Sequence, residues 1–391
     1  MPERKKIAAV VTEYRVPAHA DVIVGKFIKG FPTDEGLLEP QVDIASLYLD
    51  QIPDNDIGLQ VAAAHQIPVY RSIRQALCLG GDELAVDGVI SIGEHGDYAT
   101  TELDQTLWPR RYFFEQISGV IGRSGRPIPV FSDKHLAYNW PDAKWMYDRA
   151  KALKIPFMAG SSVPLMWRDP WLEHERGAPI DEALMIGYGS LEGYGFHALE
   201  ALQAMVERRA EIEPGIAAVQ CLEGPAVWKA GDDGRWSRQL AAAAIERGKP
   251  QPGRMEEVCK EPVVFCLQYR DGFRTAVLRL PGYVSGWIYA ARVAGRVQVT
   301  VLNTHGPPHP SFSYMGLNIQ KMFLTGVPQY PVERTLLISG ALDALMQSRH
   351  RGQVRIATPY LNVAYRAPDQ PPIRPTGTRP KGASIVPFPD E

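Results

Sequence analysis

Residues 128–160, IPVFSDKHLAYNWPDAKWMYDRAKALKIPFMAG, hold the pattern that decides the fold class of this chain. An apolar run at 128–131 predicts a buried strand, 141–154 predicts a helix, and 155–160 predicts a second buried strand. A strand, a helix and a further strand in this order form the crossover unit of a parallel sheet. We therefore expect an α/β fold around this segment.

The same alternation precedes this segment along the N-terminal part of the chain. Helical patterns separate further strand-like runs, which lie at residues 6–11, 41–49, 67–70 and 86–93. A further helix is expected over most of residues 101–124, before the run at 128–131. Residues 1–160 are therefore predicted to form a Rossmann-like, doubly wound parallel sheet of the dinucleotide-binding type.

The pattern changes after residue 160. The runs 263–269 and 274–280 flank an Asp-Gly turn, which indicates a β-hairpin, and further strand-like runs and two helices follow. We expect residues 161–366 to form an α+β domain with an open, mostly antiparallel sheet. Residues 367–391 are rich in proline and polar side chains, which predicts an extended tail.

The composition argues against several classes of function. The 391 residues carry a net charge of −2 without a long basic run, so we expect no nucleic-acid partner. Because the chain has no run of about 18 apolar residues, we expect no membrane span. The four cysteines show no CxxC spacing, which is typical of a reduced, cytoplasmic protein with unpaired thiols. A small-molecule substrate is the expected partner.

Polar residues follow two of the predicted strands. Asp133, Lys134 and His135 come directly after the run at 128–131, and the loop 93–98 (GEHGDY) follows another buried run. In an open parallel sheet, ligands bind beyond the carboxyl ends of the strands. The two clusters therefore form one candidate site, unless they are merely solvated loop residues.

Several segments resemble the Gfo/Idh/MocA oxidoreductases over most of residues 5–360. These segments are VDGVISIGEHGDY (86–98), DKHLA (133–137) followed by a helix and IPFMAG (155–160), GYGFHALEAL (193–202) and ERTLLISGALDALMQSRHRGQVRI (333–356). The resemblance implies an N-terminal domain that carries NAD or NADP and a second domain that holds a sugar, polyol or cyclitol. It also implies hydride transfer between a secondary alcohol carbon and the nicotinamide, and a homo-oligomer.

The resemblance also assigns site residues by position. Lys134 matches the lysine that bonds the reacting hydroxyl, and His197 matches an acid/base or substrate-binding histidine, so both are predicted to be catalytic. The residues predicted to bind the cofactor are Thr12, Tyr14, Arg15, Asp50, Gly93, His95 and Asp133. Those predicted to bind the substrate are Asp97, His135, Glu192 and Trp167.

The chain departs from this pattern at the first turn. A dinucleotide-binding turn needs glycines for close approach of the backbone to the pyrophosphate, and residues 12–19 (TEYRVPAH) contain none. Tyr14 is expected to fill space that the pyrophosphate needs, and Glu13 would repel it, whereas Arg15 could offer a compensating charge. Gly193 stands where the resemblance requires an aspartate, with Glu192 beside it.

Three functions follow from these observations. The first is an NAD(P)-dependent oxidoreductase acting on a sugar, polyol or cyclitol. The second is a non-redox descendant of the fold, which would be a binding or structural protein with a degenerate cofactor site. The third is a metal-assisted enzyme, because the candidate loops hold an excess of nitrogen and oxygen ligands, although their spacing is not a metal motif and no metal ligand is assigned.

Overall fold

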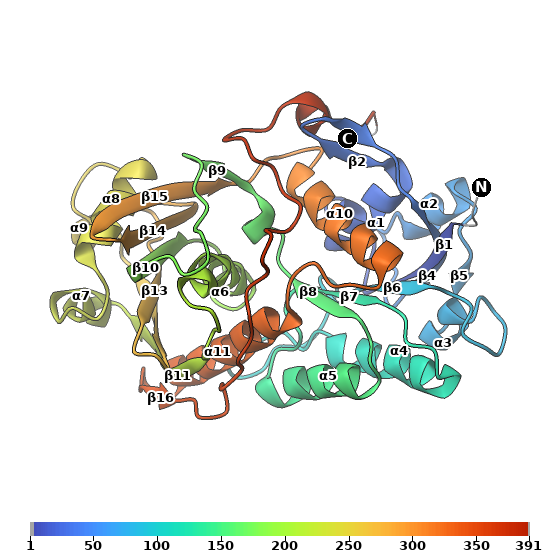
Figure 1. The fold of residues 1–391 in the computed structure, drawn as a ribbon, viewed down its shortest axis with the longest axis horizontal. Coiled ribbons are helices and arrows are strands. Elements are labelled where there is room, and N and C mark those ends of the chain that lie inside the picture. Colours follow the sequence, from blue (N-terminus) through green and yellow to red (C-terminus); the bar gives the residue numbers. More distant parts are fainter. Residues whose placement is uncertain (1–3, 390–391) are drawn as a thin grey trace.

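The structure is a computed structural model that describes residues 4–389, and Figure 1 shows two sheets lying side by side. The first sheet has six strands in the order β5-β4-β1-β6-β7-β8, and all its pairs are parallel. Its strands are β1 (Lys5–Val11), β4 (Val42–Leu49), β5 (Val69–Tyr70), β6 (Gly88–Ile92), β7 (Val130–Asp133) and β8 (Phe157–Gly160). The predicted doubly wound parallel sheet is confirmed.

Helices cover both faces of this sheet because the side chains of a strand alternate between its faces. Ile7 and Val11 of β1 pack in one core with Phe27, whereas Ala8 and Phe113 belong to the core on the opposite face. The helices of this domain are α1 (His19–Lys29), α2 (Gly58–Ala64), α3 (Ile73–Leu77), α4 (Arg110–Ser124) and α5 (Trp140–Ala152). A short hairpin joins β2 (Phe31–Thr33) to β3 (Gly36–Leu38).

The second sheet is eight-stranded and mostly antiparallel, as expected. Its order is β16-β11-β12-β13-β10-β14-β15-β9, and β10 and β13 are its one parallel pair among the described residues. The strands are β9 (Trp167–Asp169), β10 (Ile180–Gly187), β11 (Ile216–Glu223), β12 (Val263–Tyr269), β13 (Arg274–Arg279), β14 (Trp287–Val293), β15 (Arg296–Asn303) and β16 (Ile356–Ala357).

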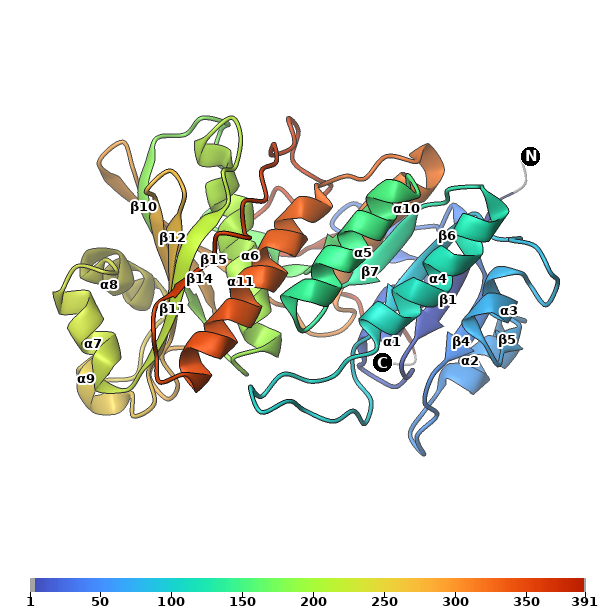
Figure 2. The same ribbon diagram turned by 90° about the horizontal axis from the view of Figure 1, so that it is seen from below.

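Helices lie on both faces of the second sheet, as the view in Figure 2 shows. Phe196 and Leu337 pack against one face, whereas Leu240 and Ala244 pack against the other. The helices that cover this sheet are α6 (Gly193–Val206), α7 (Pro225–Asp232), α8 (Arg238–Arg247), α9 (Met255–Val258) and α11 (Val332–His350). The 3₁₀ helices are Val163–Leu165, Glu207–Arg209 and Gly382–Ile385.

Helix α10 (Pro310–Thr325) follows the second sheet in sequence but packs on the first domain. Its residues Met315 and Phe323 share a core with Ile23 and Phe27 of α1. The domain cores therefore interlock, because residues from 310 to 325 complete the packing of the N-terminal sheet.

The tail runs across both domains, and Figure 1 shows it as the red segment between them. The Arg374 guanidinium forms an ion pair with Glu173 of the second domain. The Ile373 amide donates to Asn318 Oδ1 at 2.9 Å, and the Lys381 amide donates to Asp34 Oδ1 at 3.0 Å. Residues 390–391 of the predicted tail lie outside the described part.

Two element boundaries differ from those expected. The segment 101–124 is helical only from Arg110, because residues 99–109 form a loop against the second domain. Strand β7 extends to Asp133, so the predicted site begins inside the strand.

The cysteines Cys78, Cys221, Cys259 and Cys266 are free and buried. In residues 4–389, no helix has the length and apolar character needed to cross a membrane.

Candidate functional site

Lys134 lies at the meeting point of the two domains. Strands β6 and β7 are parallel neighbours, so the residues that follow them emerge at one sheet edge. There Lys134 Nζ lies 3.0 Å from Glu94 Oε1 and donates to the Gly193 carbonyl, at the start of α6, at 3.2 Å. A lysine ammonium has three protons, so one remains for a ligand.

Arg110, the first residue of α4, completes a buried charge cluster with Glu94 and Lys134. Its guanidinium forms an ion pair with Glu94. The Arg110 side chain packs over Gly93, where an added Cβ would lie 2.6 Å from Arg110 Cγ, so the glycine makes room for the arginine and does not serve a cofactor. Although burial acts to raise it, the pKa of Glu94 is held well below its usual range by Lys134 and Arg110.

His135 turns away from the ligand side, into the protein. Its Nε2 lies 2.7 Å from Glu192 Oε1, and the imidazole is 1% exposed. Burial lowers the pKa of His135, so a neutral ring donates its Nε2 proton to Glu192. The predicted substrate contact through His135 is therefore corrected: it orients Glu192, which lies between His135 and a cavity described below.

His197 is held by Ser161, which follows strand β8. The Val163 amide donates to Ser161 Oγ at 3.0 Å, and Ser161 Oγ lies 2.5 Å from His197 Nδ1. Burial, together with the charge on Lys134, lowers the pKa of His197 well below its ordinary value. The imidazole is thus neutral, and the serine hydroxyl donating to Nδ1 places the ring proton on Nε2. His197 can donate a hydrogen bond to a ligand through Nε2.

Glu200 lies one turn beyond His197 and was not identified from the sequence. Its carboxyl group accepts from the Ser161 amide at 2.5 Å and lies 2.6 Å from Thr335 Oγ1. Burial raises its pKa to about 7, so this carboxyl group titrates near neutrality. The signal in the sequence was an acid on the buried face of an otherwise apolar helix.

His19 and Asp133 form a second pair at the same sheet edge. His19 begins α1, and its Nδ1 lies 2.6 Å from Asp133 Oδ2. The ring packs edge-on against His95 and Phe312, with centroid distances of 5.2 and 5.5 Å. Burial and the charge on His19 lower the pKa of His95 to about 4. Asp133 therefore orients His19 through Oδ2, while its Oδ1 is buried without a hydrogen-bond partner in the described residues.

The β1–α1 turn is closed by its own side chains. Tyr14 is 1% exposed and points into the core, where its hydroxyl would lie 3.4 Å from a Cβ at Gly25, so its predicted position in the pyrophosphate space is wrong. Thr12 Oγ1 donates to the Glu94 carbonyl at 2.5 Å. Arg15 bonds Glu13 at 2.5 Å, and its terminal nitrogen lies 3.5 Å from His95 Nδ1.

The end of β4 is tied to the same loop. Asp50, predicted to bind a ribose, accepts from Tyr48 at 2.8 Å and from Tyr98 at 2.6 Å. The Gln51 side chain donates to the Asp97 carbonyl at 3.0 Å and accepts from the Asp97 amide at 2.8 Å. Asp97 is thus fixed through its main chain at this position.

These contacts show that the residues present do not fit a dinucleotide at the switch point of the sheet. In that binding mode the cofactor lies between the turn after the first strand and the neighbouring strand ends. Here loop 93–98 bonds directly to Thr12, Arg15, Asp50 and Gln51, which fills that space. The absence of glycines from residues 12–19 and the hydrogen bonds of loop 93–98 both argue against a dinucleotide at this turn.

Trp167 is also placed differently from the prediction. It is 0% exposed, and its indole nitrogen donates to Asp34 Oδ2 at 2.9 Å. The ring stands edge-on to Tyr314, with a centroid distance of 5.4 Å. Trp167 therefore joins the second sheet to the first domain and cannot cover a sugar face.

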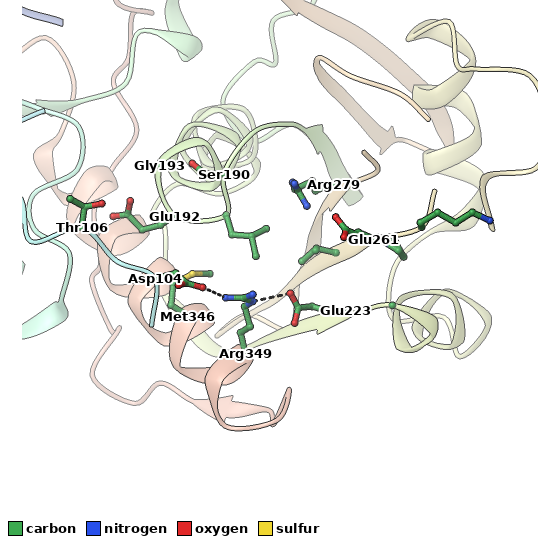
Figure 3. A pocket seen from close by; sticks show the side chains of 15 residues that line it. Asp104, Thr106, Ser190, Glu192, Gly193, Glu223, Glu261, Arg279, Met346 and Arg349 are labelled. Carbon is green, nitrogen blue, oxygen red and sulfur yellow. Dashed lines mark hydrogen bonds and ion pairs between the residues drawn. The ribbon is translucent and has the colours of Figure 1, made fainter. Parts of the chain in front are cut away.

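A cavity of about 640 Å³ opens between the domains beside the charge cluster (Figure 3). Asp104 and Thr106 line it from the first domain, and Glu192 and Gly193 line it from the second. A Cβ added at Gly193 would lie 3.8 Å from Lys134 Nζ, so the glycine brings the cavity wall close to the ammonium. Within residues 4–389, no three His, Cys, Asp or Glu side chains group in a way that could hold a metal ion.

No protein-family model matches the chain, and no curated protein matches it. Solved structures do match its fold. GenD2 from gentamicin A biosynthesis, in complex with NAD, is 16% identical with a TM-score of 0.59, over 91% of this chain and 97% of that one. The aldose-aldose oxidoreductase of Caulobacter crescentus, complexed with glycerol, is 15% identical with a TM-score of 0.52, over 91% and 100%.

The myo-inositol 2-dehydrogenase of Lactobacillus plantarum is 9% identical with a TM-score of 0.57, over 91% of this chain and 99% of that chain. These neighbours are oxidoreductases of the Gfo/Idh/MocA type, and the two-domain fold expected from the sequence is confirmed. At such identities the likeness establishes the fold alone.

Proposed function

We propose that the protein is an enzyme that moves protons on a sugar-like carbonyl compound, without a resident dinucleotide. One observation carries this proposal. Loop 93–98 is bonded across the crevice in which this fold holds its cofactor, while Lys134 and His197 remain together at the sheet edge. The site therefore keeps acid–base groups but lacks space for a hydride acceptor.

The residues at the edge divide into a base and an oxyanion site. His19, oriented by Asp133 through Nδ1, presents Nε2 as a general base, which is the arrangement of an imidazole backed by a carboxylate. Lys134 and the Nε2 proton of His197 are the donors for a negatively charged oxygen. His19, Lys134 and Glu94 all lie close enough to His197 to influence its pKa, which supports their common location.

The reaction that suits these roles is proton abstraction beside a carbonyl. His19 takes a proton from the carbon next to the carbonyl, the electron pair of that C–H bond forms a C=C bond, and the π pair of the C=O bond moves to the oxygen. The resulting enolate oxygen is stabilised by Lys134 and His197. The proton then returns to the former carbonyl carbon, and the proton of the adjacent hydroxyl moves to the enolate oxygen, which gives the isomeric sugar. No net oxidation occurs, so the step needs no oxidant.

The test is a set of aldoses, ketoses and uronates incubated with the protein in D₂O and followed by ¹H NMR, with no nicotinamide added. We expect loss of the signal from the hydrogen beside the carbonyl. We expect Lys134→Met and His19→Gln to slow this exchange by a factor of about 10² or more. His65→Gln, a change at the exposed histidine that follows α2, is the matched control and should leave the rate unchanged. Exchange that persists in both site variants would contradict the proposal.

Hydride transfer to NAD or NADP is the second candidate, and the position of Lys134 in a fold shared with the NAD complex of GenD2 favours it. Calorimetric titration with NADH and NADPH separates the two. Saturable binding, or NAD(P) retained through purification, would replace our proposal by this one. The homo-oligomer expected from the resemblance stays a prediction, which light scattering can check.

A further inference from the structure

The cavity between the domains contains one arginine whose binding groups are unused. Arg279 ends strand β13 and donates its Nε to the Gly189 carbonyl at 2.7 Å. Among residues 4–389, nothing accepts from its two terminal NH₂ groups. Figure 3 shows the Arg279 guanidinium among the lining side chains, without an interaction to any of them. Such a planar fork matches a carboxylate or phosphate through two parallel hydrogen bonds.

The other two cations of the cavity already have hydrogen-bond partners. Arg349 bonds Asp104 at 2.6 Å and Glu223 at 2.8 Å, which also joins the two domains across the cavity. Lys260 Nζ donates to the Glu257 carbonyl at 2.6 Å. In the described part of the chain, Arg279 is the cavity's only arginine without a carboxylate partner, and Lys260 is the other cation of the lining without one.

The acidic residues of the cavity limit the charge of a ligand. Glu192 is engaged by His135, whereas Glu261 has no hydrogen-bond or ion-pair partner within residues 4–389. The lining holds four acidic side chains and three basic ones, so it suits a monoanion better than a ligand of higher negative charge, and the hydroxyl groups of such a ligand can donate to Glu261. A phosphate would bring about two negative charges near these carboxylates and is disfavoured.

We infer that this cavity binds a polyhydroxylated carboxylate of the uronate class, and that the terminal groups of Arg279 donate two parallel hydrogen bonds to the carboxylate. The cavity volume of about 640 Å³ accommodates a monosaccharide acid and lies within the usual range of ligand sites. The inference rests on the proposed function in one respect: the carbonyl end of the ligand would lie against Gly193, whose carbonyl accepts from Lys134 at 3.2 Å. It adds the substrate class, which the acid–base cluster does not specify.

Isothermal titration of the full-length protein with D-glucuronate, D-glucose and D-glucose 6-phosphate tests this inference. We expect D-glucuronate to bind most tightly. Arg279→Gln should weaken D-glucuronate binding by about tenfold to hundredfold, because a charged hydrogen-bonded pair is lost, and should leave D-glucose unaffected. Arg279→Lys keeps the charge but loses the fork, so an intermediate loss is expected even if the glutamine variant folds poorly.

Arg296→Gln, a change at an exposed arginine of β15 outside the cavity, is the control and should bind as the native protein does. Equal affinity for D-glucose and D-glucuronate would overturn the inference, as would tighter binding of the phosphate or an Arg279→Lys variant with native affinity. Because binding needs no turnover, D-glucuronate that binds through Arg279 without proton exchange would refute the proposed function alone. Proton exchange on neutral sugars at a rate that Arg279→Gln does not change would refute the assignment of the cavity alone.

Discussion

Glu200 should make the protein less stable as the pH rises through neutrality. The Ser161 amide donates to one of its oxygens, and Thr335 Oγ1 lies close to both the other oxygen and the Ala159 carbonyl. A hydroxyl has one proton, so Thr335 cannot donate to both acceptors. When Glu200 is protonated, it donates to Thr335 Oγ1, and Thr335 donates to Ala159. All the groups are then satisfied.

The magnitude follows from the pKa of Glu200, which burial raises from 4.5 to about 7. Between these values the folded state holds a proton that the unfolded state has lost, so stability falls as the pH rises through this window. The full difference corresponds to about 3 kcal/mol. This loss of stability is absent at a pH below the pKa of Glu200 in the unfolded chain, and it is complete at a pH above the pKa of Glu200 in the folded protein.

Glu200→Gln imitates the protonated form, since its amide can donate to Thr335. We expect the variant to be more stable than the native protein by about 3 kcal/mol near pH 8, and equal to it near pH 4.5, in urea unfolding. Glu83→Gln, at an exposed acid without a partner among the described residues, is the control and should show no such difference. If the native protein gained stability relative to Glu200→Gln between these pH values, the reasoning would be refuted.

Two further variants examine the charge cluster and the closed crevice. Glu94→Gln leaves Lys134 and Arg110 buried without their shared carboxylate. The free energy of unfolding measured in urea should therefore fall by about 3–5 kcal/mol. An unchanged unfolding midpoint would show that these ion pairs are not desolvated. Tyr98→Phe removes the hydroxyl that bonds Asp50, so we expect a loss of about 1 kcal/mol and faster amide exchange in loop 93–98. Native exchange rates in that loop would contradict its attachment to β4.

The fold could be read from the sequence because it rests on periodicity. The buried runs and helical patterns of residues 1–160 required a parallel sheet, and the Asp-Gly hairpin marked the second sheet. The return of α10 to the first domain could not be predicted from the sequence, because the apolar face of a helix does not identify the sheet against which it packs. Residues 101–109 were included in the predicted helix 101–124, although Pro109 directly precedes the residue at which α4 begins.

The location of the site could be predicted, but its internal contacts could not. The rule for parallel strands placed Lys134 near loop 93–98, and the structure pairs Lys134 with Glu94. Arg110 was missed, because a residue at a helix start gives no sign of which strand end its long side chain will cover. Tyr14 was misplaced because its position relative to missing glycines indicates crowding but not the direction of the ring.

The closed crevice and the charge balance support the same conclusion about chemistry. A pyrophosphate at the β1–α1 turn would bring further negative charge beside Glu13 and Glu94, whose partners Arg15 and Lys134 are already engaged. Its entry would also require loop 93–98 to leave Asp50, and each broken hydrogen bond would cost about 1 kcal/mol. Residues 12–19 (TEYRVPAH) stand in place of a glycine-rich turn, and the hydrogen bonds of loop 93–98 close the crevice at the switch point of the sheet. The groups that still face the second domain at this edge can donate and accept protons, which is why we propose proton transfer for this site.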